Sequence, residues 1–277
     1  MRILITGASG FIGGKLLHCL LEKESPENIG VVLRTCSAQS LDLDNVGCHV
    51  IETPDLFSES YEWWVRVCSD IDLLIHCAWP MEYDYLESEK NLDAMMGSIT
   101  MIRGAVSAGV KKIVGLGTCL EYDRDSDYSV GSPLNPFSSY ACAKAAVYLF
   151  GRQIANRAGV AFTWCRVFGV YGPGEKPNRL FPTLHNNLAN RSMVEIKHGQ
   201  VVRDYSHVDS VVSTLLVFAL GESEKSVVNV CSGKGRSVRQ IAEAIAEEYD
   251  AHDFLRISEK SLPDSIPQTI IGLPGAT

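Results

Sequence analysis

The sequence lacks several features that would assign it to common functional classes. Its nine cysteines contain no C-x-x-C pair, so the usual zinc and redox motifs are absent. The longest apolar stretch, Val211–Leu220, is far shorter than the roughly 18 residues of a transmembrane helix. Acidic residues outnumber basic ones, 33 to 25, and the net charge of -8 disfavours a broad nucleic-acid surface. We therefore expect no metal centre, no membrane span and no nucleic-acid partner.

The remaining composition is that of an ordinary globular protein. The chain has 277 residues, of which 46% are hydrophobic and 21% charged, and it is long enough to bury a substantial core. The cysteines lie mostly within apolar stretches, a pattern typical of buried thiols in a reducing compartment. The opening residues lead into a strand-like segment instead of a signal peptide. We expect a cytoplasmic protein.

Near the start of the chain, three glycines follow a short apolar segment at three-residue intervals. Ile3–Ile5 predicts a buried strand, and a leucine-rich helical pattern begins at Lys15. Between them, Gly7 permits a tight turn, Gly10 lets a pyrophosphate approach the backbone, and Gly13 lets the helix pack close to the strand. Unpaired N–H groups at the helix N-terminus attract the anion. The stretch predicts a dinucleotide-binding loop.

Strand-like and helix-like segments alternate along the first part of the chain. Further strands are predicted over residues 29–33, 48–51, 71–75, 112–116 and 161–167, and helices over 61–67, 88–108 and 138–158. This alternation predicts an α/β fold with a Rossmann-type doubly wound parallel sheet, whose ligands bind at the carboxyl ends of the strands. We assign residues 1–171 to a dinucleotide-binding domain and 172–277 to a smaller C-terminal substrate lobe, and we allow 226–232 to return to the main sheet. Residues 265–277 are predicted as a loop.

A tyrosine and a lysine four residues apart follow the glycine loop. In Tyr140-Ala141-Cys142-Ala143-Lys144, the tyrosine and lysine side chains lie on the same helix face. A nearby cation favours the phenolate. We therefore expect Lys144 to lower the pKa of Tyr140 toward neutral pH, where the phenol can exchange a proton with a carbonyl or carbinol.

Taken together, these motifs resemble those of the extended short-chain dehydrogenase/reductase superfamily. The opening stretch matches its Thr-Gly-x-x-Gly-Phe-Ile-Gly sequence, and Tyr140 and Lys144 match its Y-x-x-x-K pair. Residues 117–122, Gly-Thr-Cys-Leu-Glu-Tyr, resemble its Ser/Thr-x-x-Val-Tyr segment at the end of the fifth strand. The resemblance implies that Thr118, Tyr140 and Lys144 are catalytic.

The resemblance also implies which residues hold a dinucleotide. In chain order they are Gly7, Ser9, Gly10, Phe11, Ile12, Gly13, Arg34, Asp55, Leu56, Ala78, Lys144 and Val167. Asp55 and Leu56 resemble the pair that borders adenine. Ala78 resembles the small residue beneath the cofactor, and Val167 a residue beside the nicotinamide. NAD enzymes of this kind carry an acidic residue at the end of the second strand, but here the strand ends at Arg34, which favours NADP over NAD.

Two later stretches resemble nucleotide-sugar enzymes of this superfamily. Residues 166–174 match the segment beside the nicotinamide, and 199–209 match G-x-x-x-R-D-x-x-x-V-x-D, whose arginine contacts the substrate nucleotide. The resemblance implies a nucleoside-diphosphate sugar as substrate, contacted by Trp79, Asn178, Phe181 and Arg203. Many relatives pair two long helices in a dimer, so a homodimer through residues 88–108 and 139–158 is a further expectation.

The residues after Thr118 narrow the expected reaction. In sugar-nucleotide 4,6-dehydratases the corresponding threonine precedes Asp-Glu, the acid and base for elimination, whereas Cys119 and Leu120 occupy those positions here. We expect an NADP-dependent reductase of a 4-keto-6-deoxy nucleotide sugar, in which hydride passes from NADPH to C4 and Tyr140 is the acid. An NAD-dependent nucleotide-sugar 4-epimerase, which uses the same three residues, is the alternative. A second alternative is a catalytically silent nucleotide-binding regulatory module.

Overall fold

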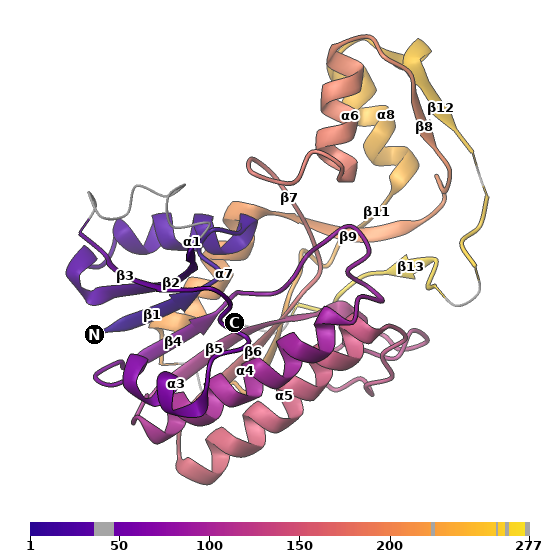
Figure 1. Cartoon of the computed structure of the whole chain (residues 1–277). Helices are drawn as coiled ribbons and strands as arrows, with labels where there is room; N and C mark the ends of the chain where they lie inside the picture. Colours follow the sequence, from indigo (N-terminus) through magenta and orange to yellow (C-terminus); the bar gives the residue numbers. More distant parts are fainter. Residues whose placement is uncertain (36–46, 223–224, 259, 264–265, 275–277) are drawn as a thin grey trace.

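A seven-stranded parallel sheet forms the centre of the molecule (Figure 1). The computed structural model describes residues 1–35, 47–222, 225–258, 260–263 and 266–274. The strands of the sheet, in chain order, are β1 (Ile3–Thr6), β2 (Ile29–Arg34), β3 (His49–Thr53), β4 (Leu73–His76), β5 (Lys112–Thr118), β6 (Ala161–Val167) and β10 (Val227–Val230). Their spatial order is β10-β6-β5-β4-β1-β2-β3. The predicted doubly wound parallel sheet is confirmed, and the returning segment near residue 230 forms its edge strand.

Helices cover both faces of this sheet, because successive strand residues point to opposite sides. In β1, Ile3 and Ile5 belong to one hydrophobic cluster and Leu4 to the other. The first face is covered by α1 (Phe11–Leu21) and α7 (Val208–Leu220). The second is covered by α3 (Tyr61–Val67), α4 (Lys90–Ser107) and α5 (Ser139–Ala158). The described residues also contain the 3₁₀ turns η1 (Pro26–Asn28), η3 (Cys119–Glu121) and η4 (His252–Phe254).

Two helix boundaries bear directly on the site. Helix α1 begins at Phe11 and not at Lys15, because close packing of the helix on the strand outweighs the weak helix propensity of Gly13 and Gly14. Helix α5 begins where the Ser138 side chain accepts a hydrogen bond from the Ala141 N–H, a standard N-cap. This cap places the predicted Y-x-x-x-K pair in the first two turns of α5.

The remaining elements form a lobe that stands away from the sheet in Figure 1. Its separate core is built from α6 (Leu180–Ala189), β8 (Val194–Ile196), α8 (Val238–Glu248) and β12 (Leu255–Ile257). A small sheet connects the lobe to the main body: β9 (Val202–His207) pairs with β7 (Gly169–Tyr171), β11 (Gly235–Ser237) and β13 (Thr269–Ile270). The segment predicted as a loop over 265–277 thus contains a short strand.

The C-terminal part of the chain contributes to both bodies. Helix α7 packs against α1 over the main sheet and β10 pairs with β6, whereas α6 and α8 pack on each other. We therefore propose that the division at residue 171 be kept, with α7 and β10 assigned to the larger domain. Within the part of the chain that the structure describes, no helix has the length and hydropathy of a membrane span. The same residues contain no cluster of three His, Cys, Asp or Glu side chains able to hold a metal ion.

Candidate active site

The loops after β1 and β4 meet at the point where the strand order reverses. Gly7 has a φ of +78°, and a Cβ there would lie 2.5 Å from the backbone nitrogen of Ala78. A Cβ on Gly13 would lie 2.2 Å from the Gly7 carbonyl oxygen. Both positions therefore admit only glycine, and the predicted close approach of helix to strand is observed.

The N-terminus of α1 is suited to an anion. Gly10 is the N-cap, and within the described chain no side chain caps this end and no acidic residue stands in its first turn. Ser9 and Gly10 are exposed, while Phe11 and Ile12 are half-buried. An exposed helix N-terminus preceded by a glycine turn fits a pyrophosphate.

Other predicted dinucleotide residues lie at the carboxyl ends of neighbouring strands. Arg34 is exposed and ends β2. After β3, the Asp55 carboxylate accepts hydrogen bonds from Phe57 N and Ser58 Oγ, both at 3.0 Å, and Leu56 is buried. Val167 is buried at the end of β6. The parallel sheet thus gathers these residues along one edge, as a dinucleotide requires.

The structure brings Thr118 and Tyr140 together. Thr118 ends β5 and is buried, and its side chain lies close enough to Tyr140 to act on the pKa of the phenol, which it lowers. Burial raises the pKa of Tyr140 well above its usual value, and Tyr85 and Glu121 raise it further. The expectation that Lys144 lowers this pKa is wrong, because removal of the phenol from water outweighs the effect of the cation.

Lys144 is buried and turns toward the sheet. Its Nζ donates to the Leu116 carbonyl oxygen at 2.7 Å and lies 4.0 Å from the centre of the Trp79 ring. Burial lowers the pKa of Lys144 to about 7, while the charge of Glu121 acts to raise it. The ammonium is therefore held by a carbonyl and by the face of an aromatic ring.

Aromatic side chains surround the Tyr140 phenol. Trp79 packs edge-to-face on Tyr140 with ring centres 6.0 Å apart, and Tyr85 does so at 5.1 Å. Trp79 Nε1 donates to Asn91 Oδ1 at 2.9 Å, and the Asn91 amide donates to the carbonyl oxygens of Tyr85 and Ser88. Asn91 is buried, so this amide fixes the loop that carries both rings.

The segment before α6 reaches the loop after β4. The Arg179 guanidinium lies 5.4 Å from the centre of the Tyr85 ring, and Lys176 Nζ donates to the Met81 carbonyl oxygen. Asn178, in the same segment, is exposed. Phe181 is buried in the core of the lobe, stacked on Tyr171 with ring centres 4.2 Å apart. Of the two predicted substrate residues in this segment, Asn178 and Phe181, only Asn178 therefore lies on a surface.

Arg203 is engaged with the C-terminal segment. Its guanidinium donates to the carbonyl oxygens of Val202, Pro267 and Gln268 at 2.8 to 3.0 Å. The charge of the guanidinium also acts to lower the pKa of Cys119, the residue after Thr118, although burial raises this pKa overall. Arg203 thus lies on the side of the lobe that faces the end of β5.

Two carboxylates near these residues were assigned no role from the sequence. Glu121 is fully buried three residues after Thr118, and the spacing Thr-x-x-Glu of a capping box was the available signal. Glu175 Oε2 is buried without a hydrogen-bond partner among the described residues, and burial raises the pKa of Glu175 to about 7. No local pattern marks Glu175.

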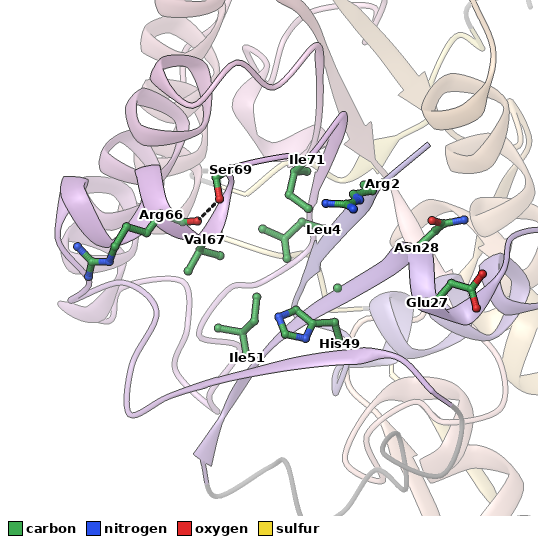
Figure 2. Close-up of a pocket in the computed structure, with 11 residues that line it drawn as sticks. Arg2, Leu4, Glu27, Asn28, His49, Ile51, Arg66, Val67, Ser69 and Ile71 are labelled. Carbon is green, nitrogen blue, oxygen red and sulfur yellow. Dashed lines mark hydrogen bonds between the residues drawn. The ribbon is translucent and has the colours of Figure 1, made fainter.

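A cavity of about 420 Å³ lies elsewhere, at the amino ends of the strands. Arg2, Asn28 and Ile71 line it just before β1, β2 and β4, and His49 begins β3. In Figure 2 the Arg66 side chain points away from the other lining residues. This cavity is on the opposite edge of the sheet from the glycine loop and belongs to a different region.

The fold and the residues at its carboxyl edge define a dinucleotide-dependent enzyme of the extended short-chain dehydrogenase/reductase type. The family model of the NAD-dependent epimerase/dehydratase family matches residues 3–231, and the chain belongs to this family. It is accordingly an NAD(P)-dependent enzyme, which confirms the class expected from the sequence.

Solved structures of nucleotide-sugar enzymes have the same fold. UDP-glucose 4-epimerase of Thermotoga maritima superposes with a TM-score of 0.86 at 23% identity, over 99% of this chain and 90% of the other. The dTDP-glucose 4,6-dehydratase DesIV of Streptomyces venezuelae gives 0.81 at 22%, over 99% and 88%. The NAD-dependent NDP-hexosamine 5,6-dehydratase TunA gives 0.78 at 26%, over 98% and 88%. These enzymes share one architecture and differ in reaction.

Proposed function

We propose that the protein is an NADP-dependent reductase of a 4-keto-6-deoxy nucleotide sugar. The observation that carries the proposal is the juxtaposition of Thr118 and Tyr140 at the carboxyl ends of the strands, where the glycine loop also lies. A reductase needs a proton donor at the substrate oxygen, and the raised pKa of Tyr140 keeps its phenol protonated at neutral pH.

In this proposal each catalytic side chain has one task. A substrate carbonyl oxygen beside the pair accepts hydrogen bonds from the hydroxyls of Thr118 and Tyr140. When bound, the reduced dinucleotide supplies the hydride that C4 takes up. Tyr140 then gives its proton to the C4 oxygen. Lys144, one turn further along α5, provides positive charge near the phenolate that remains.

The preference for NADP rests on Arg34. This exposed guanidinium stands at the carboxyl end of β2, where an NAD enzyme carries a carboxylate for the ribose hydroxyls. A guanidinium there is suited to a 2′-phosphate, because it forms charge-assisted hydrogen bonds with phosphate oxygens. The exposed end of α1 and the glycines before it would hold the pyrophosphate.

The residues after Thr118 support simple reduction over elimination. Burial raises the pKa of Cys119 to about 12, so its thiol is a poor base at neutral pH. Leu120 has no ionisable group. The Asp-Glu pair by which 4,6-dehydratases move protons therefore has no functional counterpart at positions 119 and 120.

An NAD-dependent 4-epimerase is the second candidate. The structural likeness to the Thermotoga maritima 4-epimerase favours it, since that enzyme acts on a similar class of molecule with the same fold. The Thr118, Tyr140 and Lys144 set would serve this reaction equally well. Cofactor preference and net NADPH consumption separate the two candidates.

We also propose a quaternary structure and a location for the protein. Leu92 and Met96 on α4 and Leu149 and Phe150 on α5 are exposed apolar side chains, and we propose that these helices form a homodimer. Sedimentation of the purified protein checks the dimer; a monomer at micromolar concentration would contradict it.

The eight described cysteines are free, and we propose a cytoplasmic location.

The test of the function combines binding and turnover. Thermal shift with NADP, NAD and the common nucleoside diphosphates should show the largest stabilisation with NADP, because a ligand of the folded state raises its apparent stability. A panel of 4-keto-6-deoxy nucleotide sugars should then consume NADPH. Purification with bound NAD, together with interconversion of two nucleotide sugars without NADPH consumption, would replace the reductase by the epimerase.

A further inference from the structure

Glu121 is a fully buried carboxylate beside the proposed catalytic residues. The Thr118 N–H donates to its Oε1 at 2.8 Å, and the Trp164 indole donates to its two oxygens at 2.9 and 3.2 Å. Arg166 Nε donates to its Oε2 at 2.8 Å. These donors come from the end of β5 and from β6, so the carboxylate ties two strands together where the catalytic threonine stands.

The same carboxylate completes a capping box around η3. The Thr118 side chain accepts from the Leu120 N–H at 3.3 Å while the Glu121 side chain accepts from the Thr118 N–H. This reciprocal arrangement fixes the backbone and the hydroxyl of Thr118. Because that hydroxyl lies beside Tyr140, the position of Glu121 determines the geometry of the proposed catalytic pair.

Trp164 connects the carboxylate to Lys144. Its Nε1 donates to Glu121, and Lys144 Nζ lies 5.7 Å from the centre of its ring. A Cβ on Gly117 would lie 2.1 Å from Trp164 Nε1 and 2.4 Å from Glu121 Oε1. The glycine of β5 therefore provides the space that lets the indole and the carboxylate reach each other.

We propose that Glu121 is a positioning residue, whose carboxylate orients Thr118 and supplies the negative charge that balances the Lys144 ammonium inside the protein. The inference rests on the reductase function proposed above. It assigns a task to a buried ion pair of a kind that well-packed apolar residues often replace without loss of stability.

Other titratable groups near Lys144 contribute no charge of this kind. Among the described residues, the titratable and charged groups that face Lys144 or Glu121 are His76 at the end of β4, Cys77 after it, Cys119 and Tyr122 around η3, Tyr140 on α5, and Arg166 on β6. Burial lowers the pKa of His76 to about 3 and raises that of Cys77 to about 12, so both are neutral near pH 7. The negative charge facing Lys144 at this pH comes from Glu121.

The first test removes the carboxylate charge together with that of its guanidinium partner, and keeps the hydrogen bond to Thr118. In the double variant E121Q/R166Q, a glutamine carbonyl can still accept from the Thr118 N–H, and no buried guanidinium is left without a counter-charge. Side-chain NMR of ¹⁵N-lysine protein, with the Lys144 signal assigned by K144R, follows the titration without substrate or cofactor. The Lys144 midpoint should fall by about one pH unit or more. An unchanged midpoint overturns the charge-balancing role.

A matched control disturbs the same network without changing charge. Tyr122 packs on Arg166 and donates to Asn229 Oδ1 at 2.6 Å. Y122F should lower the melting temperature but leave the Lys144 midpoint in place. A midpoint that moves equally in Y122F would assign the shift to loosened packing and would overturn the proposal.

The second test keeps the charge and breaks the positioning. In E121D the carboxylate is one methylene too short to reach the Thr118 N–H, so kcat should fall by at least tenfold, while KM and the alkaline limb of the pH profile stay in place. We expect loss of the Lys144 proton to set this alkaline limb. In E121Q/R166Q the limb should therefore move to lower pH. An E121D enzyme with unchanged kcat overturns the orienting role. If the wild type turns over no nucleotide sugar, the proposed function fails, and the NMR titration still decides the charge-balancing role.

Discussion

The sheet edge and the lobe hold their functional residues by different means. At the carboxyl edge of the sheet the backbone positions them. Gly7 and Gly13 allow close approach of loop, strand and helix, and Thr118 is positioned by its place at the end of β5. On the lobe side the positions depend on side chains, such as the Phe181 ring stacked on Tyr171 and the Arg203 guanidinium bonded to three carbonyls. The comparison teaches that the cofactor side tolerates little change, whereas the substrate side can vary.

The strongest test of this contrast is removal of the proposed proton donor on the sheet side. Y140F keeps the ring between Trp79 and Tyr85 but has no hydroxyl to give a proton. Turnover should fall by about 10²- to 10⁴-fold, the usual contribution of a general acid. Initial-rate kinetics with NADPH measure the loss, and fluorescence titration should show unchanged NADPH affinity. Turnover within twofold of the wild type would mean that another group is the acid.

A smaller but still severe effect is expected where the loop and the helix touch. In G13A the new methyl would lie 2.2 Å from the Gly7 carbonyl oxygen, so α1 must move away from β1. We expect a loss of about 1–3 kcal/mol of unfolding free energy, together with loss of NADP binding. Urea denaturation and fluorescence titration measure the two effects.

Gly131 provides the matched control for this change. A Cβ on Gly131 would find its nearest neighbour, Ser129 Oγ, at 4.0 Å, which is ordinary contact. G131A should therefore leave stability and NADP affinity close to those of the wild type. If G13A behaved like G131A, the claim that the backbone defines the cofactor side would be wrong.

The features that depend on the backbone are also those that could be predicted from the sequence. The glycine spacing and the alternation of strands and helices predicted the sheet, because turns and buried strands select residue types locally. The start of α1 at Phe11 was missed, because tertiary packing outweighed weak helix propensity.

The electrostatics of the site could not be predicted in this way. Burial raises the pKa of Tyr140, Tyr85 and Glu121 raise it further, and Lys144 turns toward Leu116 beside the Trp79 ring. Trp79 and Tyr85 are more than 50 residues away in sequence from the tyrosine that they bury. No local sequence pattern indicates that such distant side chains will meet. Their burial of the phenol raises the pKa of Tyr140, whereas a cation one turn away was expected to lower it.

A substitution of Arg34 tests whether one side chain at the carboxyl edge of the sheet sets the cofactor preference of a site that the backbone forms. R34A removes a guanidinium suited to a 2′-phosphate and leaves the loop unchanged. The KM for NADPH should rise about tenfold or more, the value of one charge-assisted hydrogen bond, while the KM for NADH should change little. Equal changes in the two KM values would show that Arg34 does not read the 2′-position.

The smallest effect is expected on the lobe side, at Glu175. Burial raises the pKa of this carboxyl from 4.5 to about 7, so the folded state holds its proton more tightly than the unfolded chain does. Folding stability should therefore fall as pH rises from about 4.5 to about 7, and the penalty should stay constant above that range. E175Q removes the charge and should raise the melting temperature by a few degrees at pH 8 but not at pH 4. Differential scanning calorimetry at the two pH values measures this difference; an equal shift at both would mean that E175Q acts through packing, and that the buried carboxyl is not the source of the pH dependence.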